Sequence, residues 1–206
     1  MNEDNRQEVL NLMNEWYIQE NIPEDVMQAR VVLIFKKGDK EDLANYRPIS
    51  LLNTFYKILA AIIQYRISIG IDKYLQKTEY GFRGNRGTAE AIHFVRRMVE
   101  KGESRQSNTH LVLFDREKAF DKIEHEKLFE ALQRMNVPEK TIIMITLFYN
   151  NAQFCISMDG KNSKWYMQQA GIRQGCPLSP YLFLIVMTVL FDDIHHNDKL
   201  KMKNRE

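Results

Sequence analysis

The chain has 206 residues, 44% of them hydrophobic, so it is long enough to bury a core as one domain or two closely joined domains. The formal net charge of +2 hides an uneven distribution: residues 30–106 carry fifteen basic and eight acidic side chains, a local +7 that suits a phosphate-binding surface or an ordinary solvated one. Two cysteines are too few for a disulfide framework, and the acidic N-terminus argues against a secretory signal. The longest apolar run, Tyr181–Phe191, is too short to span a membrane. We therefore expect an intracellular protein, nuclear or cytoplasmic, without a membrane partner.

The first half of the chain predicts helices around one strand. Apolar residues recur on one stripe of Glu8–Ile18, which predicts a short amphipathic helix, and Pro23 opens a further turn. β-Branched residues make Ala29–Phe35 a predicted strand. The apolar spacing then predicts a long helix from Leu51 to about Leu75, and another helix starting near Thr88.

The second half alternates strands and helices. An apolar run predicts a strand over His110–Phe114, and Pro138 opens the second of two helices that follow it. The remaining expected elements are a helix from about His125 to Met135, strands over Gln153–Met158 and Lys164–Gln168, and a final helix over Ser179–His195. We find no internal repeat, low-complexity tract or flexible linker.

Asp115 follows the apolar run Val112–Phe114, at the point where the predicted strand ends before a helix begins. A lone aspartate in this position is by itself more typical of a strand-to-helix cap. A centre with two metal ions needs several carboxylates that bridge the pair. Asp115 therefore depends on its surroundings for a functional interpretation.

Four segments in a fixed order supply those surroundings. They are Leu33–Asp39 with Asn45–Leu52, Tyr80–Arg83 with Thr88, Asp115 with Ala119-Phe120-Asp121, and Gly171–Pro180. Together they resemble the reverse transcriptases of non-LTR, LINE-type retrotransposons, from about Val26 to His195. That family also carries an aromatic-x-Asp-Asp hairpin with the other metal-binding carboxylates, and the 206 residues contain none, because Phe191-Asp192-Asp193 lacks the intervening residue.

The resemblance implies that Lys36 and Arg47, on a fingers hairpin, grip the phosphates of an incoming nucleotide, with Arg adding bidentate geometry. Without the resemblance, a solvated charged turn is the favoured interpretation of Lys36. The resemblance also implies that Gln174 and Gly175 abut the nascent base pair, since a glycine lets the backbone approach a base closely.

The same resemblance implies the catalytic roles. Asp115 is the expected catalytic residue and metal ligand, joined by the Arg116 carbonyl. Ala119 and Phe120 are expected to line the sugar pocket, with Phe120 as a steric gate whose ring excludes ribonucleotides by overlap. Two Mg²⁺ ions are the implied cofactors, and Mn²⁺ is an alternative.

Template contacts are implied for Gly81, Phe82, Arg83 and Arg173, because an aromatic ring beside a glycine suits base stacking and backbone tracking. Glu79 departs from the family pattern, which has Gln there, and a carboxylate repels template phosphate. The alternative for Phe82 is that its ring packs under the following helix.

The expected fold is α+β: reverse-transcriptase fingers plus the incomplete palm of a right-hand polymerase. We expect an N-terminal helical extension over residues 1–25, fingers over 26–106 and a partial palm over 107–206. The implied function is RNA-directed DNA polymerisation with a primed RNA template and deoxynucleoside triphosphates, inactive or weak in this chain alone. Two alternatives stay open, a non-catalytic nucleic-acid-binding protein derived from a retroelement and a relic fragment.

Overall fold

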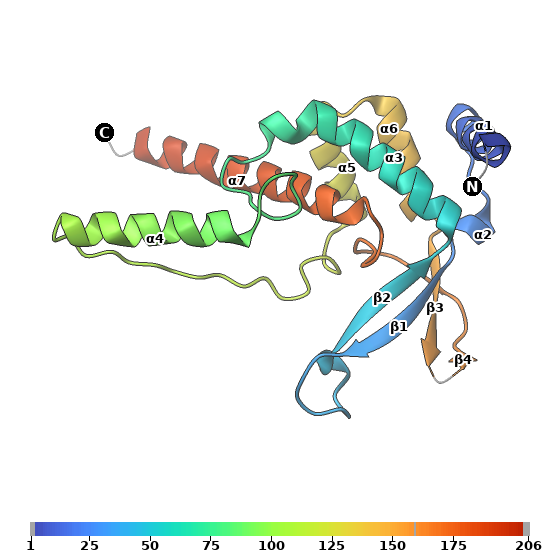
Figure 1. The fold of residues 1–206 in the computed structure, drawn as a ribbon, viewed down its shortest axis with the longest axis horizontal. Helices are drawn as coiled ribbons and strands as arrows, with labels where there is room; N and C mark the ends of the chain where they lie inside the picture. The colour runs from blue at the N-terminus through green and yellow to red at the C-terminus, as the bar shows by residue number, and fades with distance from the viewer. Residues whose placement is uncertain (1–2, 159, 204–206) are drawn as a thin grey trace.

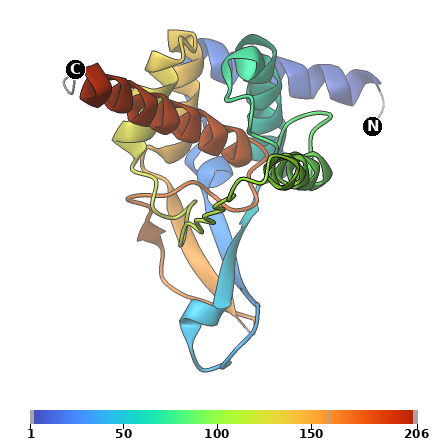
Figure 2. The ribbon, with the colours of Figure 1, turned by 90° about the vertical axis from the view of Figure 1, so that its left-hand side faces the viewer.

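The computed structural model describes residues 3–158 and 160–203, with side chains placed up to residue 196. A layer of helices lies above a β-sheet whose first two strands project away as a long hairpin (Figures 1 and 2). The elements in chain order are α1 (Glu3–Gln19), α2 (Glu24–Met27), β1 (Ala29–Phe35), η1 (Leu43–Asn45), β2 (Tyr46–Leu52), α3 (Thr54–Ile71), η2 (Asp72–Tyr74), α4 (Thr88–Ser104), α5 (His125–Arg134), α6 (Glu139–Tyr149), β3 (Gln153–Met158), β4 (Lys161–Asn162), β5 (Tyr166–Met167) and α7 (Ser179–Lys203).

The sheet joins the two halves of the chain. Its order is β2-β1-β3-β4, and β5 also pairs with β3. β1 pairs antiparallel with β2, from Ala29 opposite Leu52 to Phe35 opposite Tyr46, and parallel with β3, where Ala29 lies opposite Phe154. The predicted division at residue 106 therefore does not correspond to a division of the sheet.

The long helix α3 begins later than the sequence indicated. Leu51 and Leu52 end strand β2, and the side chain of Asn53 caps α3 by accepting a hydrogen bond from the Phe55 N–H at 2.8 Å. Asparagine is among the preferred N-cap residues, because its side-chain oxygen satisfies a free N–H of the first turn. The prediction of a helix from Leu51 is wrong, since the apolar spacing ran across this cap.

The core lies between α3, α5, α6 and α7, and its largest fully buried side chains include Tyr56, Leu128, Met144, Phe148, Leu182 and Ile185. Tyr56 and Phe148 pack with ring centroids 4.6 Å apart. The N-terminal helices share this core, because Met13 and Trp16 are buried in it and Trp16 contacts Phe55 edge-on. The predicted extension over 1–25 is thus packed against the rest, although residues 1–2, like 204–206 at the other end, lie outside the described residues.

The predicted strand His110–Phe114 is wrong. These residues form no helix or strand, and the exposed fraction of the residue reaches 93% at Phe114. A strand is stable only when its backbone groups pair with a neighbour, and no described segment pairs with this one. The segment instead runs as an extended connection beneath α4 (Figure 1).

α4 begins at Thr88 as predicted, but it makes few contacts with the core. Gly102 is its one buried residue, and Ile92, Phe94 and Met98 are exposed on its surface. None of the helices that the structure describes is both long and apolar enough to cross a membrane.

Candidate functional site

The loop 171–175 is the point at which the predicted site segments meet. The Gly171 N–H donates to the Ile123 carbonyl at 2.7 Å, and the Ile172 N–H donates to the Phe120 carbonyl at 2.9 Å. On the other side of the loop, the Ser50 N–H of β2 donates to the Gln174 carbonyl at 2.7 Å. These backbone bonds tie the loop to the turn that carries Phe120 and to the β1–β2 hairpin.

Two glycines make this close approach possible. Gly175 has φ +116°, and a Cβ there would lie 2.6 Å from the Ser50 carbonyl oxygen. Gly171 has φ +84°, and its Cβ would lie 2.9 Å from the Asp121 carbonyl oxygen. Both conformations favour glycine, and the space for a side chain is taken by backbone. The contact with β2 therefore requires glycine at position 175, independently of the predicted approach to a base.

The side chains of Gln174 and Phe120 also meet partners from distant segments. The Gln174 amide donates to the Asp121 carboxylate at 3.2 Å. The Phe120 ring stacks on Phe183 of α7, with centroids 5.2 Å apart and planes 12° apart. Its other contact is edge-on with Phe82, at 6.4 Å and 82°. The structure thus brings Phe82, Phe120 and Gln174 to one region, and Ala119 adjoins Phe120 in the chain.

Arg173 lies inside the protein, which corrects its predicted contact with a template. Only 3% of the residue is exposed. Its guanidinium donates to the Met27 carbonyl at 2.7 Å and to the Gln168 side chain at 3.2 Å, and it lies 5.4 Å from the centroid of the Tyr56 ring. A side chain so enclosed cannot reach a nucleic acid, and it instead anchors the loop 171–175 to the end of α2.

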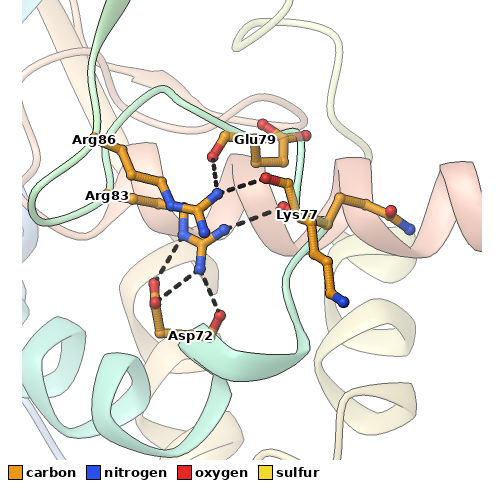
Figure 3. Close-up of polar contacts among 6 residues, drawn as sticks. Asp72, Lys77, Glu79, Arg83 and Arg86 are labelled. Atoms are coloured by element: carbon orange, nitrogen blue, oxygen red, sulfur yellow. Dashed lines mark hydrogen bonds and ion pairs between the residues drawn. The ribbon is translucent and has the colours of Figure 1, made fainter. Parts of the chain in front are cut away.

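The loop 76–87 is organised around two arginines (Figure 3). Arg83 forms a bidentate pair with the Asp72 carboxylate, at 2.8 and 3.1 Å, and also donates to the carbonyls of Asp72 and Gln76. Arg86 donates to the carbonyls of Lys77 and Glu79. The Arg83 side chain is 6% exposed, so its predicted template contact is corrected to a structural role. Burial also raises the pKa of Glu79.

The Asp72–Arg83 pair leads to a pH-dependence prediction. The hydrogen bonds and charge of Arg83 lower the pKa of Asp72 below its ordinary value of about 3.9. The pair therefore stabilises the fold above that value, and the contribution is lost as the pH falls through the folded-state pKa. We expect Asp72→Asn to lower Tm at pH 7 and to flatten the fall of Tm between about pH 5 and pH 2, measured by scanning fluorimetry. An equally steep fall in variant and wild type contradicts this assignment.

Lys36 and Arg47 lie on the distal half of the β1–β2 hairpin. Arg47 is opposite Ile34 in the strand pairing, and the Lys36 N–H donates to the Asn45 carbonyl at 2.8 Å. Both residues are exposed, and neither forms an ion pair with a residue that the structure describes. Arg47 is three residues along β2 from Ser50, roughly 10 Å from the Gln174 contact.

Asp115 is not gathered with these residues. It is exposed on the extended connection, and no hydrogen bond or ion pair of its carboxylate occurs within the described part of the chain. The side chain of its neighbour Arg116 donates to the sulfur of Met187 at 2.8 Å. The described residues contain no group of three or more His, Cys, Asp or Glu side chains arranged for a metal ion. One exposed carboxylate does not fit a two-metal centre, which needs several.

Residues that the sequence did not single out complete the arrangement. Phe183 stacks on Phe120, Ser50 holds Gln174, and Met27 holds Arg173. Phe183 lies four residues after Ser179 in a helix that is apolar nearly all round, so no local signal marks it. Ser50 lies inside the motif segment Asn45–Leu52, and this position was the signal in the sequence that could have identified it.

Comparison with known proteins identifies similar sequences. The model of the family described as "Reverse transcriptase (RNA-dependent DNA polymerase)" matches residues 34–202. The chain is 29% identical, over 85% of its length, to the "Retrovirus-related Pol polyprotein from type-1 retrotransposable element R2" of Nasonia vitripennis, of which it covers 17%. It is 29% identical, over 76% of its length, to the "RNA-directed DNA polymerase from mobile element jockey" of Drosophila funebris, of which it covers 17%.

A third relative, the "Transposon TX1 uncharacterized 149 kDa protein" of Xenopus laevis, is 25% identical over 85% of this chain, which covers 14% of that protein. The chain thus spans between 14% and 17% of the length of these three relatives. The match to retrotransposon proteins agrees with the resemblance stated from the motifs.

Proposed function

The chain belongs to the reverse transcriptase (RNA-dependent DNA polymerase) family, of the non-LTR retrotransposon type, and we propose that it provides the nucleotide-binding and template-binding face of such a polymerase. The observation that supports this most is the meeting of three segments at the loop 171–175. Backbone hydrogen bonds join that loop to the Phe120 turn and to Ser50 of the hairpin. Polymerases need this kind of fixed geometry, because much of their catalysis is positioning.

Each segment has a proposed role at this face. Lys36 and Arg47 have no ion pair of their own among the described residues, which leaves their charges available for a triphosphate. Gln174 and Gly175 abut the base pair, and Phe120, beside Ala119, lies beneath the sugar. Gly81 and Phe82 follow the template, since Phe82 is 61% exposed and its ring is accessible for stacking on a base.

Metal chemistry is a property of the family, and the described residues contribute one candidate ligand to it. We assign that role to Asp115, with the Arg116 carbonyl beside it, and Mg²⁺ as the ion. Because a single carboxylate cannot bridge two ions, no catalytic step follows from these residues alone. The chain's own contribution is therefore to bind and orient nucleotide and primed RNA.

The right-hand description of the fold is also part of the proposal. The β1–β2 hairpin with α3 corresponds to fingers, and the segment after residue 106 corresponds to a partial palm. The parallel pairing of β1 with β3 means that part of this second segment belongs with the fingers in space. An exposed Asp115 without companion carboxylates also favours the second candidate function, nucleic-acid binding without catalysis.

Binding and synthesis can be separated experimentally. We expect the chain to bind a primed RNA template in a salt-dependent manner, and to extend the primer little or not at all with Mg²⁺ or Mn²⁺. Arg47→Ala is expected to weaken formation of the nucleotide-dependent complex about tenfold, by removing a bidentate phosphate contact. Asp115→Asn should leave RNA binding unchanged. Fluorescence anisotropy and primer extension measure the two properties.

The control for Arg47→Ala is Lys127→Ala on α5, where the lysine pairs with Glu130 at 2.9 Å on an exposed surface. Efficient template-directed synthesis would show that this chain carries a complete catalytic centre. The absence of any salt-dependent RNA binding would contradict the proposed function itself.

A further inference from the structure

The ring of Phe120 contacts two other aromatic rings that come from separate segments. Phe183 of α7 stacks on one face, with centroids 5.2 Å apart and planes 12° apart. Phe82 of the loop 76–87 meets the ring at 6.4 Å with planes 82° apart. Offset stacking and edge-to-face contact are the two favoured arrangements of aromatic pairs.

A steric gate needs such support. A phenylalanine ring has two rotatable side-chain bonds, so it rejects an added hydroxyl only when it cannot rotate out of the way. Phe120 is half-buried, and its backbone is fixed by the hydrogen bond from Ile172 to the Phe120 carbonyl at 2.9 Å. The backbone hydrogen bond fixes the position of the Phe120 backbone, and the two neighbouring rings restrict the rotation of its side chain.

Phe82 is itself kept in an uncommon conformation. Its φ of +56° lies in the left-handed region, which costs free energy for a residue with a bulky side chain. Arg83, the next residue, is bonded to Asp72 and to two carbonyls, and Arg86 is bonded to two more (Figure 3). Phe82 is 61% exposed, so core packing does not explain the position of its ring beside Phe120.

We propose that Phe82 and Phe183 are specificity-determining positioning residues, which hold the Phe120 ring against the 2′ position of the sugar and so set the preference for deoxynucleotides. The inference rests on the proposed function and extends it to two residues outside the sugar pocket. The inference also assigns a role to the loop 76–87, because that loop carries Phe82, one of the two positioning residues.

The test is a nucleotide-dependent complex that needs no catalysis. The 206-residue chain is mixed with Mg²⁺, an RNA template and a DNA primer that ends in a dideoxynucleotide. The complementary deoxynucleotide or ribonucleotide is then titrated, and the concentration that half-stabilises the complex is measured for each. The ribonucleotide concentration divided by the deoxynucleotide concentration reports sugar selectivity. A merely structural defect raises both concentrations in parallel and leaves this ratio unchanged.

We expect Phe82→Leu and Phe183→Leu each to lower this ratio about fivefold. In Phe183→Leu the deoxynucleotide concentration should change about twofold at most, whereas Phe82→Leu also loses its proposed template contact and is therefore judged by the ratio alone. Phe120→Ala should lower the ratio further, by more than about tenfold. Phe191→Leu, on the same helix as Phe183 but outside the aromatic group, is the matched control and should retain the wild-type ratio. Should Phe183→Leu fail to fold, the exposed Phe82 carries the test.

The possible failures are distinguishable. A ratio that falls in Phe120→Ala but stays unchanged in Phe82→Leu and Phe183→Leu overturns the inference and leaves the proposed function standing. A parallel loss of both nucleotides in these two variants also overturns it. If the wild-type chain forms no nucleotide-dependent complex at all, the proposed function fails together with the inference.

Discussion

Gly175→Ala is expected to detach the loop 171–175 from the hairpin. The new Cβ would lie 2.6 Å from the Ser50 carbonyl oxygen, at a backbone φ of +116° that alanine rarely adopts. Strain and overlap together should cost about 3 kcal/mol of unfolding free energy, or roughly 10 °C in Tm. Because the loop loses its bond to Ser50, the nucleotide-dependent complex on primed RNA should weaken by more than about tenfold. Thermal melting and the complex assay measure the two effects.

The control is Gly70→Ala. Gly70 is exposed in α3, and a Cβ there meets nothing within 4 Å. Alanine is favoured over glycine inside a helix by about 0.5–1 kcal/mol, so this variant should be slightly more stable than the wild type. A wild-type Tm in Gly175→Ala would show that the loop relaxes freely and that its contact with β2 does not matter.

Arg173→Ala is expected to destabilise the whole fold. The substitution removes the donor to the Met27 carbonyl at 2.7 Å and the contact with the Tyr56 ring, and leaves a cavity in their place. An unsatisfied buried carbonyl together with a cavity costs on the order of 3–5 kcal/mol. Chemical denaturation should show this loss directly. Arg173→Lys should recover a part of it, because lysine offers one charged donor without the planar guanidinium.

Arg47→Ala provides the opposite pattern, since Arg47 is exposed on β2. Its unfolding free energy should stay within about 0.5 kcal/mol of the wild type, as for most surface substitutions, while nucleotide binding falls. If Arg173→Ala kept its stability and lost RNA binding instead, the template contact first implied for Arg173 would be restored.

The sequence predicted elements well where the signal was local. Ala29–Phe35 is a strand with the predicted bounds, because its β-branched residues favour extended backbone and its neighbours on both sides are available for pairing. α4 begins at Thr88 as predicted. For the same kind of apolar run at His110–Phe114 the prediction was wrong, since strand formation depends on a partner that residue types cannot reveal.

The candidate site was predicted only in part, for the same physical reason. Motif spacing located Phe120, Gln174 and Gly175, which the structure brings near one another. Charge alone could not distinguish Arg47, which is exposed, from Arg83 and Arg173, which bond inside the protein. That distinction depends on tertiary contacts with Asp72 and Met27, which lie 11 and 146 residues from Arg83 and Arg173 in the chain.

The central claim is that the hairpin, the Phe120 turn and the loop 171–175 form one face that receives nucleotide and primed RNA. Hydrogen–deuterium exchange, with and without primed RNA and the complementary deoxynucleotide, tests it most directly. The account predicts slower exchange in residues 46–50, 118–123 and 171–176, and no change in 133–147, which comprise the end of α5 and most of α6. Protection confined to α5 and α6, or no protection in any of the three segments, would contradict it.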